Sequence, residues 1–273
     1  MINVKLNNGV EMPILGLGVY KITDKKELYN AVKWALEYGY RKFDTAQFYD
    51  NEKELGEAIK NSAFKREEVF ITTKIWNTNQ GYKSATESFE ESLKKLNTDY
   101  IDLLLIHWPG QKKERYLDTW RALEDIYKNK KARAIGLSNF EIKHLKDILE
   151  NCKVAPVINQ IERHPNLNRN ELIDFCKSCN IFVEAWSPLG RGKFIQNEIL
   201  KDIAKKYNKT AAQIILRWDI ENEVAVIPKS VKKERIEENI NVFDFKLDVE
   251  DIKKIDLMNN DERTGLNPLE FDF

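Results

Sequence analysis

Residues 101–138 read IDLLLIHWPGQKKERYLDTWRALEDIYKNKKARAIGLS, and their pattern decides which fold we expect. Residues 101–107 are almost entirely apolar, which is typical of a strand that is buried on both faces. Residues 116–131 place apolar side chains on one face of an amphipathic helix. Residues 132–138 form a second short β-rich run. A strand, a helix and a strand in this order predict one βαβ unit of a parallel sheet.

The same alternation of β-rich runs and amphipathic stretches continues along the whole chain. Eight strands alternating with helices predict an α/β fold, a closed (β/α)8 TIM barrel that forms a single domain over residues 1–273. Two short β-like pieces around Asn8-Gly9 add an N-terminal β-hairpin in residues 2–12, and residues 249–259 add an extra C-terminal helix. The predicted barrel strands are residues 14–18, 40–44, 69–74, 101–107, 132–138, 156–162, 181–186 and 224–228.

Two local signals refine this prediction. Asp24 stands three residues before Glu27, and Thr210 three residues before Gln213, and both spacings are typical of a helix start. An open doubly wound sheet is the alternative fold. Its glycine-rich fingerprint is incomplete, because the segment that begins at Gly16 lacks the third glycine.

Composition excludes several classes of protein. The 273 residues carry 44 basic and 44 acidic side chains, so no net charge favours nucleic acid or an anionic membrane. No apolar run approaches 18 residues, and the N-terminus is too polar for a signal peptide, so we expect a cytoplasmic protein. Cys176 and Cys179 form a C-x-x-C motif but share a helix face with Leu172 and Phe175. This placement favours two cysteines that pack in the hydrophobic core over a redox-active pair. We also expect no metal site.

Reactive side chains stand where the predicted strands end, which is where such barrels collect them. Asp44, Lys74 and His107 end three strands, and Tyr49 follows the first of these by five residues. Asp44 could keep a buried Lys74 charged, and a nearby ammonium would lower the pKa of Tyr49. His107 could orient or protonate a bound oxygen. The four residues therefore predict a proton-donating site, although each alone could be a structural residue.

Seven segments make a resemblance to a known family specific. They occur in the family's order and extend from residue 4 to about residue 268. Because of these segments, the chain resembles the aldo-keto reductases. Within that family it resembles a bacterial and protozoan branch of diketogluconate reductases and prostaglandin F synthases. The segments are GYRKFDTAQFYDNE (39–52), ITTKIW (71–76), DYIDLLLIHWP (99–109), IGLSNF (135–140), NQIERHP (159–165), WSPLG (186–190) and IPKSV (227–231).

The resemblance implies an NADPH-dependent oxidoreductase that reduces aldehydes and ketones to alcohols by hydride transfer. Tyr49 matches the family's proton donor, and Lys74 matches the partner that lowers the pKa of that donor. Asp44 matches the carboxylate that pairs with the lysine, and His107 matches the residue that orients the carbonyl. These roles agree with the physics, because donors aimed at the growing charge on the carbonyl oxygen stabilise the transition state.

The resemblance also assigns positions to the cofactor. Ser138, Asn139 and Gln160 match residues that hold the nicotinamide carboxamide, and Trp186 matches an aromatic residue that stacks on the ring. The match of Lys229, Ser230 and Arg235 to a clamp on the 2′-phosphate implies NADPH rather than NADH. The full set of implied cofactor-binding residues is Gly18, Asp44, Ser138, Asn139, Gln160, Trp186, Ser187, Leu189, Lys229, Ser230, Val231, Arg235 and Asn239.

The sequence indicates the substrate less closely than it indicates the reaction and the cofactor. The residues that match the family's apolar walls are Tyr20, Phe48, Trp76 and Trp108. The loops around them are short, which favours an open site for small dicarbonyls, keto sugars or aromatic aldehydes. Arg163 would favour carboxylated or hydroxylated substrates if it faced the pocket, and its direction is open.

Two other functions are compatible with the sequence. One is an NADPH-binding sensor or partner subunit with little turnover, which the intact set of Tyr49, Lys74 and His107 disfavours. The other is an aldolase that forms a Schiff base at Lys74, for which the 2′-phosphate clamp would have no purpose. The resemblance to the family suggests a monomer with a small-molecule carbonyl substrate and no nucleic-acid or membrane partner.

Overall fold

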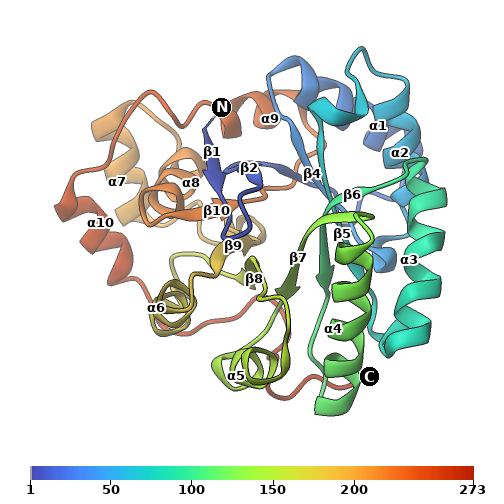
Figure 1. Ribbon diagram of the computed structural model, residues 1–273. Helices are drawn as coiled ribbons and strands as arrows, with labels where there is room; N and C mark the ends of the chain where they lie inside the picture. The colour runs from blue at the N-terminus through green and yellow to red at the C-terminus, as the bar shows by residue number, and fades with distance from the viewer. Residues whose placement is uncertain (1) are drawn as a thin grey trace.

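Eight parallel strands form the centre of the protein in a computed structural model that describes residues 2–273 (Figure 1). The strands pair in chain order, and the backbone next to β3 bonds to β10. The amide of Gly16 donates to Val226 O at 2.9 Å, and the amide of Val226 donates to Ile14 O at 2.8 Å. These bonds close the sheet and confirm the predicted barrel. Its strands are β3 (Leu17–Gly18), β4 (Lys42–Asp44), β5 (Phe70–Ile75), β6 (Ile101–Ile106), β7 (Ala132–Ser138), β8 (Ile158–Glu162), β9 (Phe182–Trp186) and β10 (Val224–Val226).

The strand boundaries follow the prediction within a few residues. β7 has the predicted bounds, and β6 is buried along its whole length, as the continuous apolar run indicated. The predicted strand at residues 224–228 ends earlier, at Val226. Proline cannot donate to a ladder, so Pro228 cannot continue this strand as a regular partner.

Helices surround the barrel, most of them between consecutive strands (Figure 1). The two predicted helix starts are confirmed, because the side chain of Asp24 accepts from the amide of Glu27 and that of Thr210 from the amide of Gln213. The helices are α1 (Lys25–Glu37), α2 (Glu52–Lys60), α3 (Tyr82–Leu96), α4 (Lys113–Lys128), α5 (Ile142–Asn151), α6 (Asn170–Ser178), α7 (Glu198–Tyr207), α8 (Ala211–Glu221), α9 (Lys233–Ile240) and the predicted extra helix α10 (Val249–Asp256).

The predicted N-terminal hairpin covers the end of the barrel where the strands begin. β1 (Asn3–Lys5) pairs antiparallel with β2 (Glu11–Pro13). The side chain of Asn7 donates to the carbonyls of Pro156 and Asn180 at 3.0 Å each. The hairpin therefore closes the bottom of the barrel, which leaves the opposite end for a site.

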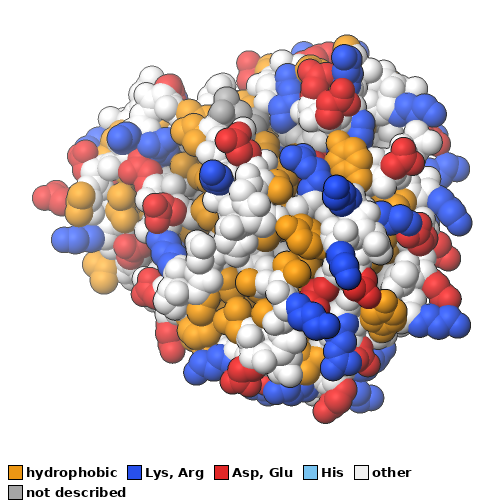
Figure 2. Space-filling model, in the orientation of Figure 1, with side chains coloured by type: hydrophobic (Ala, Val, Ile, Leu, Met, Phe, Trp, Pro, Cys, Tyr) orange, Lys and Arg blue, Asp and Glu red, His pale blue; other side chains and the backbone are white. Residues whose placement is uncertain are grey.

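The surface agrees with the balanced charge of the sequence. On the face seen in Figure 2, basic and acidic side chains are interspersed, with apolar side chains between them. Within residues 2–273, the structure has no helix of the length and hydropathy that a membrane crossing requires.

Gly56 allows α2 to approach the end of α3 closely. A Cβ at Gly56 would lie 2.5 Å from the carbonyl oxygen of Leu96, closer than real Cβ atoms come to backbone. In an open helix position, alanine would be about 1 kcal/mol better than glycine. The contact with Leu96 is expected to reverse this preference.

We therefore expect Gly56→Ala to lower the free energy of unfolding by about 1–3 kcal/mol, because one of the two helices must shift. Urea denaturation followed by circular dichroism measures this change. The control is Lys53→Ala, an exposed position on the same helix, which should leave stability nearly unchanged. Equal stability of Gly56→Ala and the native chain would contradict this description of the helix contact.

Candidate functional site

A buried ion pair lies at the end of the barrel where the strands end. The ammonium of Lys74, near the end of β5, donates to Oδ1 of Asp44 at 2.6 Å and to the carbonyl of Thr45 at 2.9 Å. Both charged side chains are almost completely buried. Parallel strands β4 and β5 are neighbours, so their carboxyl ends bring these two residues together, as the sequence predicted.

Tyr49 stands beside this pair on the 3₁₀ turn η1 (Gln47–Tyr49). Its hydroxyl oxygen is 3.4 Å from Nζ of Lys74. The side chain of Gln47 fixes the turn, because its oxygen accepts from the amide of Trp76 at 2.8 Å and its nitrogen donates to Ser88 O at 3.1 Å. Gln47 was not identified from the sequence as a site residue. The signal that could have identified Gln47 is its position in the segment 39–52, between Asp44 and Tyr49.

The electrostatics of Tyr49 differ from the expectation. Burial raises the pKa of the Tyr49 hydroxyl well above its usual value, and the negative charge of Asp44 raises it further. The pKa of Tyr49 is therefore raised overall, whereas the sequence led us to expect that Lys74 would lower it. Asp44 lies closer to the Lys74 ammonium than Tyr49 does, so the Asp44 carboxylate offsets part of the positive charge that favours a phenolate at Tyr49. Tyr49 is consequently a neutral hydroxyl at physiological pH.

His107 completes the group that the sequence predicted. Its ring meets the Tyr49 ring edge-on, with centroids 5.6 Å apart. Burial lowers the pKa of His107 well below its usual value, and the charge of Lys74 lowers it further. The imidazole is therefore neutral at physiological pH. Within residues 2–273, its buried Nδ1 meets no hydrogen-bonding partner.

Asn139 joins the ends of three strands next to His107. Its backbone has a left-handed φ of 64°, which asparagine tolerates better than most residues. Its amide nitrogen donates to the carbonyl of His107 at 2.9 Å and to Oγ of Ser138 at 3.1 Å. Its oxygen accepts from the indole of Trp186 at 2.8 Å. Ser138, Asn139 and Trp186 are thus brought to the same place as His107, as expected.

Gln160 lies on the same side of the barrel, inside the ring of strands. Its amide nitrogen donates to Oδ2 of Asp44 at 2.7 Å. The same nitrogen donates to Oε2 of Glu184, also at 2.7 Å. The amide oxygen of Gln160 receives no hydrogen bond from the described part of the chain. Gln160 therefore links the ion pair of Asp44 and Lys74 to Glu184 on β9.

The remaining cofactor positions occupy loops after β9 and β10. Ser187 takes a left-handed φ of 49° directly after Trp186, and Leu189 packs on the core. A Cβ at Gly18 would lie 2.9 Å from Ile227 O, so glycine lets β3 approach the chain after β10. Lys229 and Arg235 are exposed and take part in no ion pair within residues 2–273. The other residues predicted here are Ser230 and Asn239, which are buried, and Val231, which is half-buried.

Aromatic side chains surround Tyr49 and His107 at the end of the barrel, and we call this aromatic group the mouth of the site. Phe48 stacks on Trp76 with ring centroids 4.0 Å apart. The ring centroids of Tyr20 and Tyr49 are 4.9 Å apart. Trp108 packs edge-on against Phe271 of the C-terminal segment at 5.0 Å. Three of the predicted wall residues, Tyr20, Phe48 and Trp76, thus lie around Tyr49 and His107. The fourth, Trp108, lies beside Trp186 and Phe271 instead. Phe271 was missed, because it is more than 160 residues away from Trp108 in the chain and no local pattern connects the two.

The C-terminal segment is held against Trp186 by a buried carboxylate. Oε1 of Glu162, the last residue of β8, accepts from the amide of Thr264 at 2.6 Å and from the amide of Gly265 at 3.0 Å. A Cβ at Gly265 would lie 2.4 Å from the indole of Trp186, so only glycine allows this approach. Glu162 was not identified from the sequence. The segment therefore forms part of the wall around the site.

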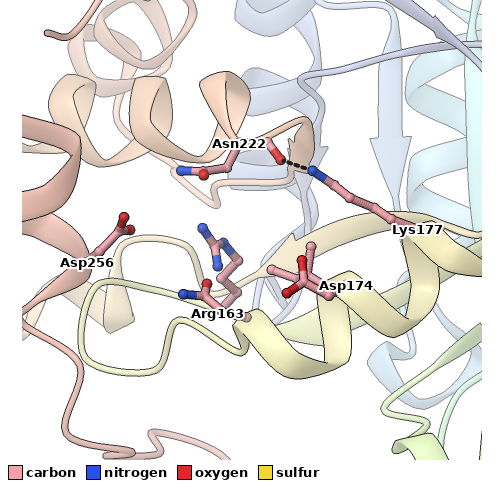
Figure 3. Close-up of a pocket in the computed structure, with 7 residues that line it drawn as sticks. Arg163, Asp174, Lys177, Asn222 and Asp256 are labelled. Atoms are coloured by element: carbon pink, nitrogen blue, oxygen red, sulfur yellow. Dashed lines mark hydrogen bonds between the residues drawn. The ribbon is translucent and has the colours of Figure 1, made fainter. Parts of the chain in front are cut away.

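Arg163 does not face the mouth. Its Nε donates to Oδ1 of Asp219 at 2.6 Å, and its guanidinium lies 4.0 Å from the ring centroid of Trp218. Figure 3 shows it at a small cavity of about 210 Å³ beside α6, together with Asp174, Lys177, Asn222 and Asp256. The direction of Arg163, which the sequence left open, is therefore toward Asp219 and Trp218, and the condition for a role in substrate selection is not met.

The two cysteines of the C-x-x-C motif belong to α6 and its end. Cys176 is fully buried and Cys179 half-buried, and both are free thiols that pack on the hydrophobic core. Burial raises the pKa of the Cys176 thiol to about 12, so its thiolate is disfavoured at neutral pH. This environment agrees with the prediction of core cysteines.

Comparison with known proteins agrees with this arrangement. Residues 14–260 match the Aldo/keto reductase family. The chain is 53% identical over 270 residues to the glyoxal reductase of Bacillus subtilis (strain 168), with 99% of this chain and 97% of that protein covered. It is 51% identical over 271 residues to the 9,11-endoperoxide prostaglandin H2 reductase of Trypanosoma cruzi (strain CL Brener), with 98% and 95% covered.

A solved structure extends the similarity to three dimensions. A mutant of Gox0644 in complex with NADPH superimposes with a TM-score of 0.95 at 40% sequence identity, and the match covers 100% of this chain and 99% of that one. The family match covers most of the chain, and the relatives match nearly all of it. The chain belongs to the aldo/keto reductase family.

Proposed function

We propose that this protein is an NADPH-dependent reductase of small aldehydes and ketones in which Tyr49 donates the proton. The observation that carries the proposal is the neutral Tyr49 hydroxyl, 3.4 Å from a buried Lys74–Asp44 pair and beside a neutral His107, at the base of an aromatic mouth. NADPH, when bound, supplies a hydride to the carbonyl carbon. The chain supplies the proton and the orientation of the substrate.

The proton transfer follows from the growing charge on the substrate. As the carbonyl carbon accepts a hydride, its oxygen becomes negative and basic. The Tyr49 O–H is the donor for this oxygen, and the neutral imidazole of His107 positions it. The Lys74 ammonium stabilises the phenolate that forms at Tyr49, since an opposite charge favours the ionised form. Lys74 thus acts when the proton leaves and does not ionise Tyr49 beforehand.

The cofactor positions fit a nicotinamide dinucleotide with a 2′-phosphate. The amide oxygen of Gln160 is available to accept from a carboxamide N–H, and the Trp186 indole is held in place by Asn139 at 2.8 Å for stacking. Lys229 and Arg235 are exposed cations that pair with no acid in residues 2–273. Two uncompensated cations suit a phosphate dianion.

The preferred substrate class is small dicarbonyls. The relative that reduces glyoxal supports this choice, and so does a mouth built from flat aromatic walls. With Arg163 turned away, no arginine from this strand end faces the substrate, so an uncharged carbonyl compound is favoured over a carboxylated one.

Removing the Tyr49 hydroxyl tests its role as the proton donor. We expect Tyr49→Phe to lower kcat for methylglyoxal reduction by about 10²–10⁴-fold, the typical contribution of a general acid. NADPH binding, followed by quenching of tryptophan fluorescence, should stay close to that of the native protein. Tyr29→Phe, which removes a hydroxyl from an exposed tyrosine on α1, is the matched control. Retained turnover in Tyr49→Phe would remove this residue from its role.

Removing one cation tests the preference for NADPH. Arg235→Ala should weaken NADPH binding by about 10–100-fold, the equivalent of one hydrogen bond to a charged group, while NADH binding changes little. Arg121→Ala on the outer face of α4 controls for the loss of a surface charge. Titration of both cofactors measures the effect. Equal losses for NADPH and NADH would contradict the assignment of Arg235 to the 2′-phosphate.

A further inference from the structure

A second buried ion pair lies inside the barrel, below the site. Lys42 on β4 and Glu184 on β9 are both fully buried, and Glu184 is the one charged residue of its strand. The Lys42 ammonium donates to Oε1 of Glu184 across the barrel and to Pro13 O at 3.3 Å. Charged side chains are almost never this deeply buried unless they are paired. The proton-donating group described above does not require this pair.

The pair is connected to the site through Gln160. Gln160 and Glu184 are directly opposite each other on the neighbouring strands β8 and β9. Oε2 of Glu184 accepts from the Gln160 amide nitrogen at 2.7 Å, and Asp44 accepts from the same nitrogen at the same distance. Lys42 and Asp44 are two residues apart on β4, so both side chains point to the same face of the strand. Lys42, Glu184, Gln160, Asp44 and Lys74 therefore form one continuous chain of contacts.

This geometry determines which way the Gln160 amide points. An amide group has two N–H donors and one oxygen. Two carboxylates, which accept only, contact the nitrogen of Gln160. If the amide turned over, its oxygen would face both carboxylates, which would be repulsive. The orientation that the carboxylates impose leaves the amide oxygen for another donor.

We propose that Glu184, with its charge balanced by Lys42, is a positioning residue that fixes the Gln160 amide so that its oxygen accepts from the carboxamide of the nicotinamide ring. This inference rests on the proposed function, because it takes the nicotinamide end of the cofactor to lie at Gln160. Glu184 itself does not touch the cofactor. Asp44 alone would hold one N–H of Gln160, and Glu184 holds the other.

The alternative is that Lys42 and Glu184 only stabilise the barrel. A single substitution would not separate the two roles, because it would leave one charge buried without a partner and would endanger folding. Replacing both charges by apolar groups of similar size is often neutral or stabilising. The double variant Lys42→Met/Glu184→Met therefore removes the acceptor for Gln160 without leaving an unpaired charge.

The test compares two ligands that share one end. NADPH contains the nicotinamide, whereas adenosine 2′,5′-bisphosphate contains only the adenosine end. We expect Lys42→Met/Glu184→Met to weaken NADPH binding by about 2–10-fold, the equivalent of one hydrogen bond between neutral groups. Its kcat should fall as well, and its affinity for adenosine 2′,5′-bisphosphate should stay unchanged. Isothermal titration of both ligands and a thermal melt of each variant provide the measurements.

A conservative variant provides the rescue. Lys42→Met/Glu184→Gln restores an oxygen that can accept from Gln160 without restoring the charges, so it should recover most of the NADPH affinity. NADPH affinity and kcat that stay native in Lys42→Met/Glu184→Met would overturn the proposal and leave a purely structural pair. Equal weakening of both ligands would also overturn it, since it would indicate a general distortion.

The outcome for the native protein separates this inference from the proposed function. If the native protein binds NADPH but reduces no carbonyl compound, the proposed function fails while the binding comparison still decides the role of Glu184. If the native protein does not bind NADPH, both proposals fail. Native turnover together with unchanged NADPH affinity in Lys42→Met/Glu184→Met overturns only the role of Glu184.

Discussion

The buried ion pair between Lys74 and Asp44 is the interaction on which the rest of the site depends. Two charges withdrawn from water are tolerated only with good geometry and further hydrogen bonds. The barrel provides both, because neighbouring strands place the two groups 2.6 Å apart and the carbonyl of Thr45 and the amide of Gln160 complete their bonding. The pair in turn places an ammonium next to the Tyr49 hydroxyl. Loss of either charge would leave the other buried and unpaired.

The alternation of β-rich runs and amphipathic stretches predicted the fold closely, because a strand such as β6 is buried along its whole length and its sequence is correspondingly apolar. The strand ends therefore identified Asp44, Lys74 and His107, and the structure brings these together with Tyr49. The interactions that the sequence did not reveal are the ones that cross the barrel or return from the C-terminus. Glu162 and Phe271 bind or pack against segments more than 100 residues away. Glu184 was detectable only as a charge within an apolar strand, and Lys42 stands in a short strand that also carries Asp44.

The orientation of Arg163 and the direction of the pKa shift of Tyr49 could be determined only from the structure. Arg163 stands at a strand end, yet a carboxylate in α8 and the face of Trp218 draw it away from the mouth. The pKa of Tyr49 is raised by burial and Asp44 rather than lowered by Lys74, because charge compensation depends on distances that no sequence pattern specifies. The chemistry is thus placed on rigid strand ends, while the walls that meet the substrate come from loops and from the C-terminal segment.

The measurement that tests the central claim most directly follows the hydride itself. NADPH carrying two deuterium atoms at C4 of the nicotinamide is incubated with methylglyoxal and the native protein, and the alcohol is analysed by mass spectrometry and NMR. The account predicts one deuterium on the former carbonyl carbon and a proton from solvent on the new hydroxyl. Unchanged methylglyoxal, or an alcohol without deuterium on that carbon, would contradict it.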